Sequence, residues 1–77
     1  MSEVLSQVMQ YVGKRFKVDP SKLKPNDDFF ETLGINSLQA LDLLGDLELE
    51  FGVEVPDYAL KETTTFEGIA KVIERAQ

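Results

Sequence analysis

The sequence contains no cysteine, no histidine and no tryptophan. Without cysteine the chain can form no disulfide bond, and it has no thiolate to offer a metal ion or a substrate. Without histidine it lacks the commonest metal-binding nitrogen and the side chain that most often transfers protons near neutral pH. We therefore expect a protein that is not an enzyme, with no catalytic residue and no metal site.

The sequence also lacks a membrane-spanning run and a secretory signal. No apolar stretch approaches the roughly 20 residues that a transmembrane helix needs. Glu3 stands near the start, where a secretory signal would carry basic residues. These features predict no membrane insertion and a cytoplasmic location, with which the lack of cysteine agrees.

Basic residues are few and unevenly placed. The chain has 8 lysines and arginines against 14 acids, and its net charge of −6 disfavours nucleic acid as a partner. Residues 26–60, the acidic segment, contain no lysine or arginine. Their acids are Asp27, Asp28, Glu31, Asp42, Asp46, Glu48, Glu50, Glu54 and Asp57. Such a segment either keeps a small protein soluble or docks basic partners, and composition alone favours solubility.

The length of 77 residues predicts one domain, spanning residues 1–77, with a thin core. Apolar residues at steps of three and four indicate helices. The three main helices are expected at 3–16, at 37–51 and from Thr65 to about Arg75. The fold class that follows is all-α, a small four-helix bundle with three main helices and one short helix.

The segments between the main helices carry weaker signals. Residues 18–36 contain two prolines and no sustained apolar stripe, so we expect a long loop between the first and second helices, with one helical turn near Ser21. The short helix is predicted from Asp57 to about Leu60, after the preset backbone of Pro56. Thr64 and Glu67 form the pattern of a capping box before the last helix.

The ends of the helix at 37–51 are well marked. Asn36 is a strong N-cap, and Gln39 three residues later completes a pattern that resembles a capping box. Gly52 fits the left-handed cap that ends a helix. Ser37 is then the first helical residue, with its hydroxyl facing solvent where the helix dipole favours a negative substituent. From the residues alone, an ordinary structural serine is the stronger interpretation.

The same helix carries apolar residues on two opposite faces. On a helical wheel, the face expected in the core holds Ala40, Leu43, Leu44, Leu47 and Phe51. The opposite side holds the docking strip, which consists of Leu38, Leu41, Gly45 and Leu49 and is flanked by Asp42, Asp46 and Glu48. A small bundle has too few elements to cover both faces, so we interpret the docking strip as a partner-binding surface. For Leu38, coverage by the preceding loop is an equally good interpretation.

Nearly the whole chain resembles the acyl carrier proteins. The resemblance rests on residues 27–57, DDFFETLGINSLQALDLLGDLELEFGVEVPD, and on the later TTTFEGIAKVI. It implies a carrier that holds acyl intermediates as thioesters on 4′-phosphopantetheine and presents them to enzymes of fatty-acid or polyketide synthesis. The group would come from coenzyme A and be attached covalently to Ser37, between Asn36 and Leu38.

The resemblance also implies the partners. These are a phosphopantetheinyl transferase and acyl-transferring, condensing and chain-modifying enzymes, whose basic patches would dock on the second helix of a monomer. The carried chain would fold back between the helices, with a lining of Leu43, Leu47, Phe51, Tyr58, Leu60 and Ile69, although plain core packing predicts the same residues.

Three positions depart from the family pattern. Asn36 stands where the family usually has aspartate, which puts the efficiency and choice of transferase in question. Gly45 and Leu49 stand where many relatives carry a larger apolar residue and an acid, so partner preference would differ from housekeeping fatty-acid synthesis. The alternative from another class is an unmodified acidic adaptor that binds a basic partner through its second helix, with Ser37 serving only in the cap.

Overall fold

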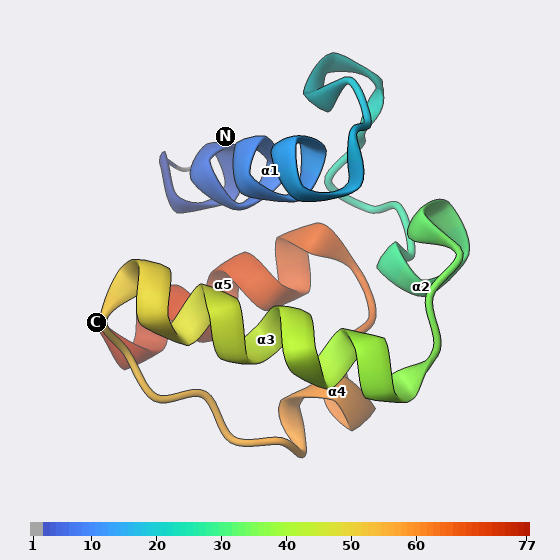
Figure 1. Cartoon of the computed structure of the whole chain (residues 1–77). Coiled ribbons are helices and arrows are strands. Elements are labelled where there is room, and N and C mark those ends of the chain that lie inside the picture. The colour runs from blue at the N-terminus through green and yellow to red at the C-terminus, as the bar shows by residue number, and fades with distance from the viewer. Residues whose placement is uncertain (1–2) are drawn as a thin grey trace.

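Three long helices form the frame of the protein in a computed structural model that describes residues 3–77 (Figure 1). They are α1 (Glu3–Phe16), α3 (Ser37–Phe51) and α5 (Phe66–Ala76). The residues described contain no β-strand, and none of their helices combines the length and apolarity needed to cross a membrane. The expected all-α bundle is confirmed, and α1 and α3 have the predicted bounds.

The connection between α1 and α3 is more helical than expected. The turn predicted near Ser21 is present as the 3₁₀ helix η1 (Pro20–Lys22). The side-chain and backbone hydrogen bonds that Ser21 donates to Asp19 lower the pKa of that carboxyl. A further helix, α2 (Phe29–Leu33), lies within the segment predicted to be loop, so that part of the prediction is wrong.

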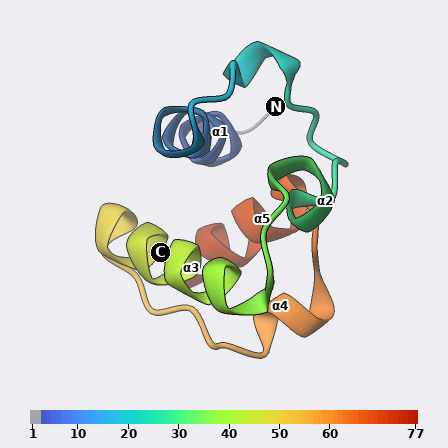
Figure 2. The same ribbon diagram turned by 45° about the vertical axis from the view of Figure 1, so that its right-hand side comes forward.

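Local capping explains α2. The Asp28 carboxylate accepts hydrogen bonds from the backbone N–H groups of Phe30 (2.8 Å) and Glu31 (3.2 Å), which begin the helix. Gly34 ends it in the left-handed conformation, with φ of 64°. The rings of Phe29 and Phe30 stack with centroids 4.7 Å apart. In Figure 2, α2 stands at one end of the bundle between α1 and the start of α3.

The helix α4 (Ala59–Glu62) begins two residues later than predicted. The residues just before this helix form a tight turn, in which the Ala59 N–H donates to the Pro56 carbonyl at 3.0 Å. The N-cap of α5 is also displaced by one residue from the prediction. Thr65, rather than Thr64, accepts a hydrogen bond from the N–H of Gly68 at 3.0 Å.

Backbone pairing before α2 and α5 explains the displaced cap. The Thr64 carbonyl accepts from the Phe29 N–H at 2.8 Å, and the Pro25 carbonyl accepts from the Glu67 N–H at 2.8 Å. Asp28 and Thr65 form an isolated antiparallel bridge at this point. Because Thr64 is held in extended pairing with the segment before α2, the helix can begin only after Thr65.

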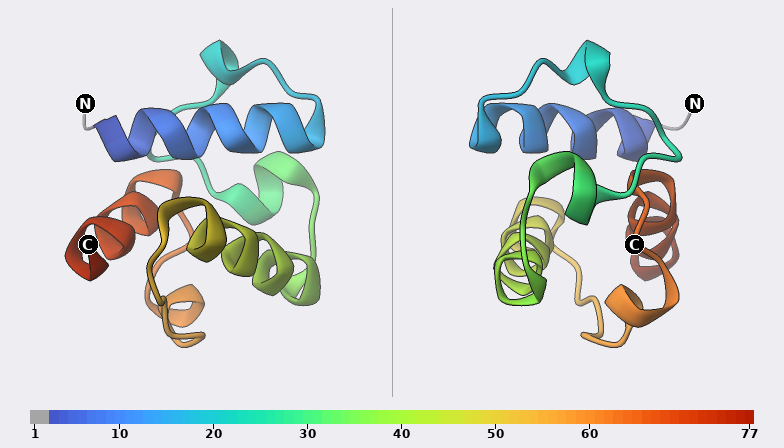
Figure 3. Two further views of the ribbon diagram at one scale, coloured as in Figure 1. Left: turned by 60° about the vertical axis from the view of Figure 1, so that its left-hand side comes forward. Right: turned by 90° about the vertical axis from the view of Figure 1, so that its right-hand side faces the viewer.

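The core lies between α1, α3 and α5, with α4 closing its lower side (Figure 3). The residues of α3 predicted to face the core are buried, except that Phe51 is only half-buried. Buried apolar residues are Leu5, Val8, Met9, Val12, Leu23, Phe29, Ile35, Ala40, Leu43, Leu44, Leu47, Val55, Ala59, Phe66, Ile69, Ala70 and Ile73. Every element except η1 contributes to this core, so its packing sets the position of α3 relative to α4.

Two helical glycines predict opposite effects of an added methyl group. A Cβ on Gly13 would lie 2.6 Å from the Val18 carbonyl oxygen and 2.7 Å from Cγ of Pro20, so Gly13→Ala should lower the free energy of unfolding by about 1–3 kcal/mol. A Cβ on Gly45 would meet no atom within 4 Å, so Gly45→Ala should raise that free energy by about 1 kcal/mol. Thermal unfolding followed by circular dichroism measures both changes. Equal effects of the two variants would contradict this account.

Candidate functional site

The candidate site begins at the N-terminus of α3, where two side chains cap the helix. Oδ1 of Asn36 accepts from the Gln39 N–H at 2.9 Å, and Oε1 of Gln39 accepts from the Asn36 N–H at 3.0 Å. These reciprocal bonds confirm the predicted capping box. Ile35, immediately before it, is buried and anchors the chain as it enters the helix.

Ser37 is the first residue of α3, and its side chain is exposed. Across residues 3–77 no group forms a hydrogen bond or ion pair with its hydroxyl. A serine hydroxyl becomes a strong nucleophile only with an adjacent base, and the pair Asn36–Gln39 offers none. Ser37 is therefore an exposed hydroxyl that Asn36 and Gln39 do not activate.

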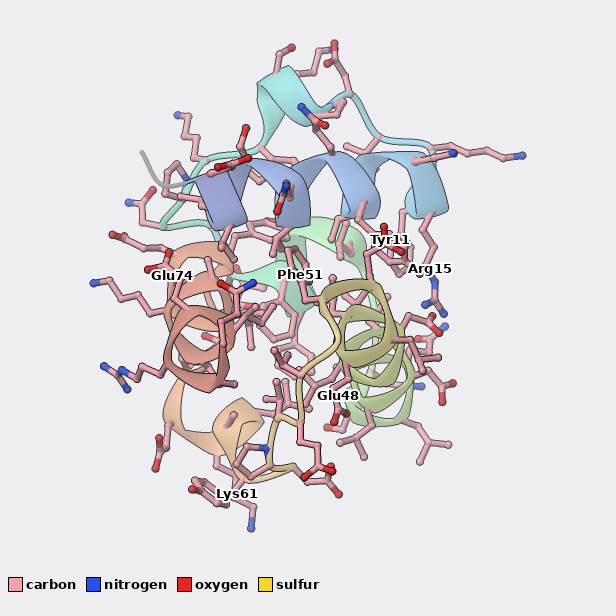
Figure 4. All side chains as sticks on the ribbon, turned by 90° about the vertical axis from the view of Figure 1, so that its left-hand side faces the viewer. Tyr11, Arg15, Glu48, Phe51, Lys61 and Glu74 are labelled. Carbon is pink, nitrogen blue, oxygen red and sulfur yellow. The ribbon has the colours of Figure 1, made fainter. Side chains whose placement is uncertain are left out.

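Ser37 opens onto a surface groove of about 340 Å³ between the start of α3 and α4. The apolar part of its wall comes from Phe30, Leu41 and Leu60, while Tyr58 adds an exposed aromatic ring. Asp57 and Lys61 are the charged residues of the lining. Figure 4 shows Lys61 on α4 at the edge of the molecule. This Ser37 groove offers an extended, largely apolar surface beside a free hydroxyl.

The interior of the bundle has almost no free space. The void among the core side chains measures about 10 Å³, roughly the room for one water molecule. Of the residues predicted to line an acyl cavity, Leu43, Leu47, Leu60 and Ile69 border this void. Phe51 and Tyr58 do not border it, and the lining of a carried chain stays a prediction for all six residues.

The positions of Phe51 and Tyr58 explain why they miss the interior. Phe51 is in the last turn of α3 and lines a separate groove against α1. Tyr58 precedes α4 and is exposed in the Ser37 groove. Open space therefore lies beside Ser37 rather than among the core residues.

The docking strip is exposed, as predicted. The exposed fractions are 73% for Leu38, 38% for Leu41 and 85% for Leu49, and Gly45 is half-buried. The preceding loop therefore does not cover Leu38, and that alternative is wrong. Exposed leucines repeated on one side of a helix make an apolar surface suited to a partner.

The three acids that flank the docking strip differ in their surroundings. Asp46 forms an ion pair with Arg15 of α1. Glu48, which is labelled in Figure 4, accepts a hydrogen bond from the Val55 N–H at 3.0 Å. Asp42 is exposed, with no hydrogen bond or ion pair to any of residues 3–77. These two internal partners were not predicted, because Arg15 lies far from Asp46 along the chain and Val55 meets Glu48 only across the end of the helix at Gly52.

The sequence analysis also missed the charged wall of the Ser37 groove. The sequence analysis assigned Lys61 no role, and it named Asp57 only as an acid of the acidic segment and as the start of the short helix. Both line the groove because α4 and the turn before it lie beside the start of α3, which is a tertiary arrangement without a local signal.

Comparison with known proteins identifies the family of the chain. The family model described as the phosphopantetheine attachment site matches residues 6–73, a span that contains the whole Ser37 groove. The chain is 38% identical over 72 residues to an acyl carrier protein of Thermosynechococcus vestitus, covering 94% of this chain and 89% of that relative. It is 36% identical over 77 residues to an acyl carrier protein of Sinorhizobium fredii, covering 100% and 99%. It is 45% identical over 56 residues to the mitochondrial acyl carrier protein 2 of Arabidopsis thaliana, covering 73% and 44%.

Proposed function

The chain belongs to the acyl carrier protein family, whose covalent prosthetic group is 4′-phosphopantetheine, and from this premise we propose that Ser37 carries that group. The observation that supports Ser37 is its free, exposed hydroxyl at the start of a long helix. The other serines in the matched span fit less well. Ser6 is half-buried within α1, and the Ser21 hydroxyl donates to Asp19 at 2.8 Å.

The residues around Ser37 suit a phosphodiester-linked arm. The N-terminus of α3 directs backbone N–H groups and the positive end of the helix dipole toward this point, which stabilises an anion. Lys61 adds a cation to the groove, and Asp57 partly offsets it. When bound, the group supplies a terminal thiol that holds acyl groups as thioesters. The apolar wall of the groove gives the arm a surface to lie on.

The protein acts as a tether and does not make bonds itself. It has no thiol and no histidine, and its free serine has no base. Holding an acyl group on an arm raises the effective concentration of that group at each enzyme that binds the carrier.

Partner enzymes dock on the exposed face of α3 next to the arm. The docking strip supplies apolar contact, and Asp42 supplies a free carboxylate for a basic patch. These partners are the phosphopantetheinyl transferase that loads Ser37 and the acyl-transferring, condensing and chain-modifying enzymes that use the product, and the carrier meets them as a monomer. An unmodified acidic adaptor with the same face is the competing function.

The attachment to Ser37 is tested by intact mass. After incubation with coenzyme A and a broad-specificity phosphopantetheinyl transferase, the wild type should gain one phosphopantetheine group and Ser37→Ala should gain none. Ser21→Ala is the matched control and should load normally, since its hydroxyl is held by Asp19. A loaded Ser37→Ala variant, or a wild type that no transferase loads, would favour the adaptor.

The cap residue should affect loading without affecting folding. Aspartate and asparagine cap helices about equally, so Asn36→Asp should leave the free energy of unfolding nearly unchanged. It restores the charge that the family pattern places beside the serine, so the initial loading rate should rise. Asn36→Ala is the control and should lower the free energy of unfolding by about 1 kcal/mol. An unchanged loading rate in Asn36→Asp would show that the charge has no role.

Charge and apolar contact on the docking face should affect different rates. Asp42→Lys should chiefly slow association with the transferase, and the loss should shrink as salt rises, since the screening length near 0.15 M is only about 8 Å. Leu41→Ala should chiefly speed dissociation and depend little on salt. Stopped-flow binding across a salt series measures both rates. Association of Asp42→Lys at the wild-type rate in low salt would limit the acidic segment to a role in solubility.

A further inference from the structure

One side chain separates the Ser37 groove from the core. Leu60 of α4 lines the groove on one side and the internal void on the other, and no other side chain of residues 3–77 lines both. It is half-buried and packs against the buried apolar residues of the core. The helix that carries it closes the lower side of the core (Figure 3). Leu60 therefore stands between the modified serine and the interior of the bundle.

Two phenylalanine rings complete this wall. Phe30 lines the groove, Phe29 borders the void, and the two rings stack with centroids 4.7 Å apart. Phe29 is 3% exposed, and its ring centroid lies 6.2 Å from that of Phe66, which is 2% exposed. Side chains packed at the density of a protein interior leave little room for a further group. Together with Leu60, these rings close the groove off from the core.

Space and exposed apolar surface are found on the groove side of the wall. The groove measures about 340 Å³, and the void measures about 10 Å³. Tyr58 and Leu41 both line the groove, and they are 59% and 38% exposed. An acyl chain that covers them removes apolar surface from water without displacing any core side chain. Entry into the core would instead force well-packed side chains to shift.

We propose that Leu60 is a specificity-determining residue that keeps the acyl group carried on Ser37 in the Ser37 groove and out of the core. The occupant of the groove is the apolar part of that acyl group, which lies against Tyr58 and Leu41. The groove suits acyl groups short enough to lie along this surface, and a longer chain extends into solvent. This inference rests on the proposed attachment to Ser37, and it differs from the internal lining that the family resemblance implies.

The position of the acyl group can be measured by nuclear magnetic resonance. Wild type is loaded from octanoyl-coenzyme A by a broad-specificity phosphopantetheinyl transferase, and intact mass confirms the loaded form. Nuclear Overhauser effects from isotope-labelled octanoyl methylenes should reach the Tyr58 ring and the Leu41 methyl groups. They should be absent at Leu47 and Ile69, which border the void. Contacts of the octanoyl group with Leu47 or Ile69 in wild type would overturn the proposal. Absence of contacts with Tyr58 and Leu41 would overturn it as well.

Truncation of Leu60 should open the wall. In Leu60→Ala the octanoyl chain can fill the cavity that is left, so new contacts with Leu47 and Ile69 should appear. The rise in melting temperature from the acetyl form to the octanoyl form should exceed the wild-type rise by at least about 4 °C, since burial in the core removes more apolar surface than contact at the surface. Leu41→Ala is the matched control, because Leu41 lines the groove but not the void. Its rise should be no larger than that of wild type.

A milder variant keeps the test valid if Leu60→Ala does not fold. Leu60→Val should show the same changes to a smaller extent, and circular dichroism controls for folding in each case. Equal rises in wild type and in the folded Leu60 variant, with no new contacts at Leu47, would show that Leu60 is not the barrier.

Intact mass separates this inference from the proposed function. A wild type that is not loaded loses both the attachment to Ser37 and the role of Leu60. A wild type that is loaded, but whose octanoyl group contacts the core, keeps its proposed function and loses only the role of Leu60.

Discussion

The buried face of α3, formed by Ala40, Leu43, Leu44 and Leu47, is the constraint on which the rest of the structure depends. Successive residues of an α-helix are rotated by about 100°, so packing of this face in the core also fixes the direction of every other side chain of α3. The exposed leucines of the docking strip follow from that rotation. The reciprocal hydrogen bonds between Asn36 and Gln39 fix the residue at which the helix begins, which makes Ser37 its first residue, beside the groove.

A filled interior and an open surface groove determine where a carried group can lie. The rings of Phe29 and Phe66, with centroids 6.2 Å apart, occupy the space at one end of the bundle, and the remaining void is about 10 Å³. Protein interiors are packed as densely as organic crystals, so entry of a hydrocarbon chain would require the helices to move apart. The Ser37 groove is available without such a movement. In the described arrangement, the free space nearest to Ser37 is therefore at the surface and not in the core.

The long helices were predictable from the sequence, but the contacts between elements were not. The bounds of α1 and α3 followed from an apolar stripe, and for α3 from clear caps at both ends. The helix α2 was missed because five residues are too few to show a period, although Asp28 and Gly34 are its capping signals. The cap of α5 was assigned to Thr64 because adjacent threonines are equally good caps locally. Only the long-range pairing of Thr64 with Phe29 makes Thr65 the cap.

In the candidate site, too, the features set by one helix could be predicted, and the contacts between helices could not. The first position of Ser37 and the exposure of the docking strip follow from helical geometry alone. The Lys61 wall of the groove and the Arg15–Asp46 pair arise where separate helices meet, and a single sequence carries no local signal for such contacts. The number of acids in the acidic segment could be counted from the sequence. Which of these carboxylates have partners inside the protein could not.

Two acids of α3 contact other parts of the protein while Asp42 is exposed, and the small size of the domain explains this difference. A thin core leaves the surface to help hold the elements together, and Glu48 does so by accepting a hydrogen bond from the connector at Val55. Asp46 joins α3 to α1 in the same way. Surface ion pairs contribute only about 0–1 kcal/mol each, so such contacts can yield to a partner at little cost in stability. In the proposed function, recognition would then rest on the free carboxylate of Asp42 and the exposed leucines, a combination that favours rapid arrival and ready release. A carrier that serves several enzymes in turn, as we propose, needs both properties.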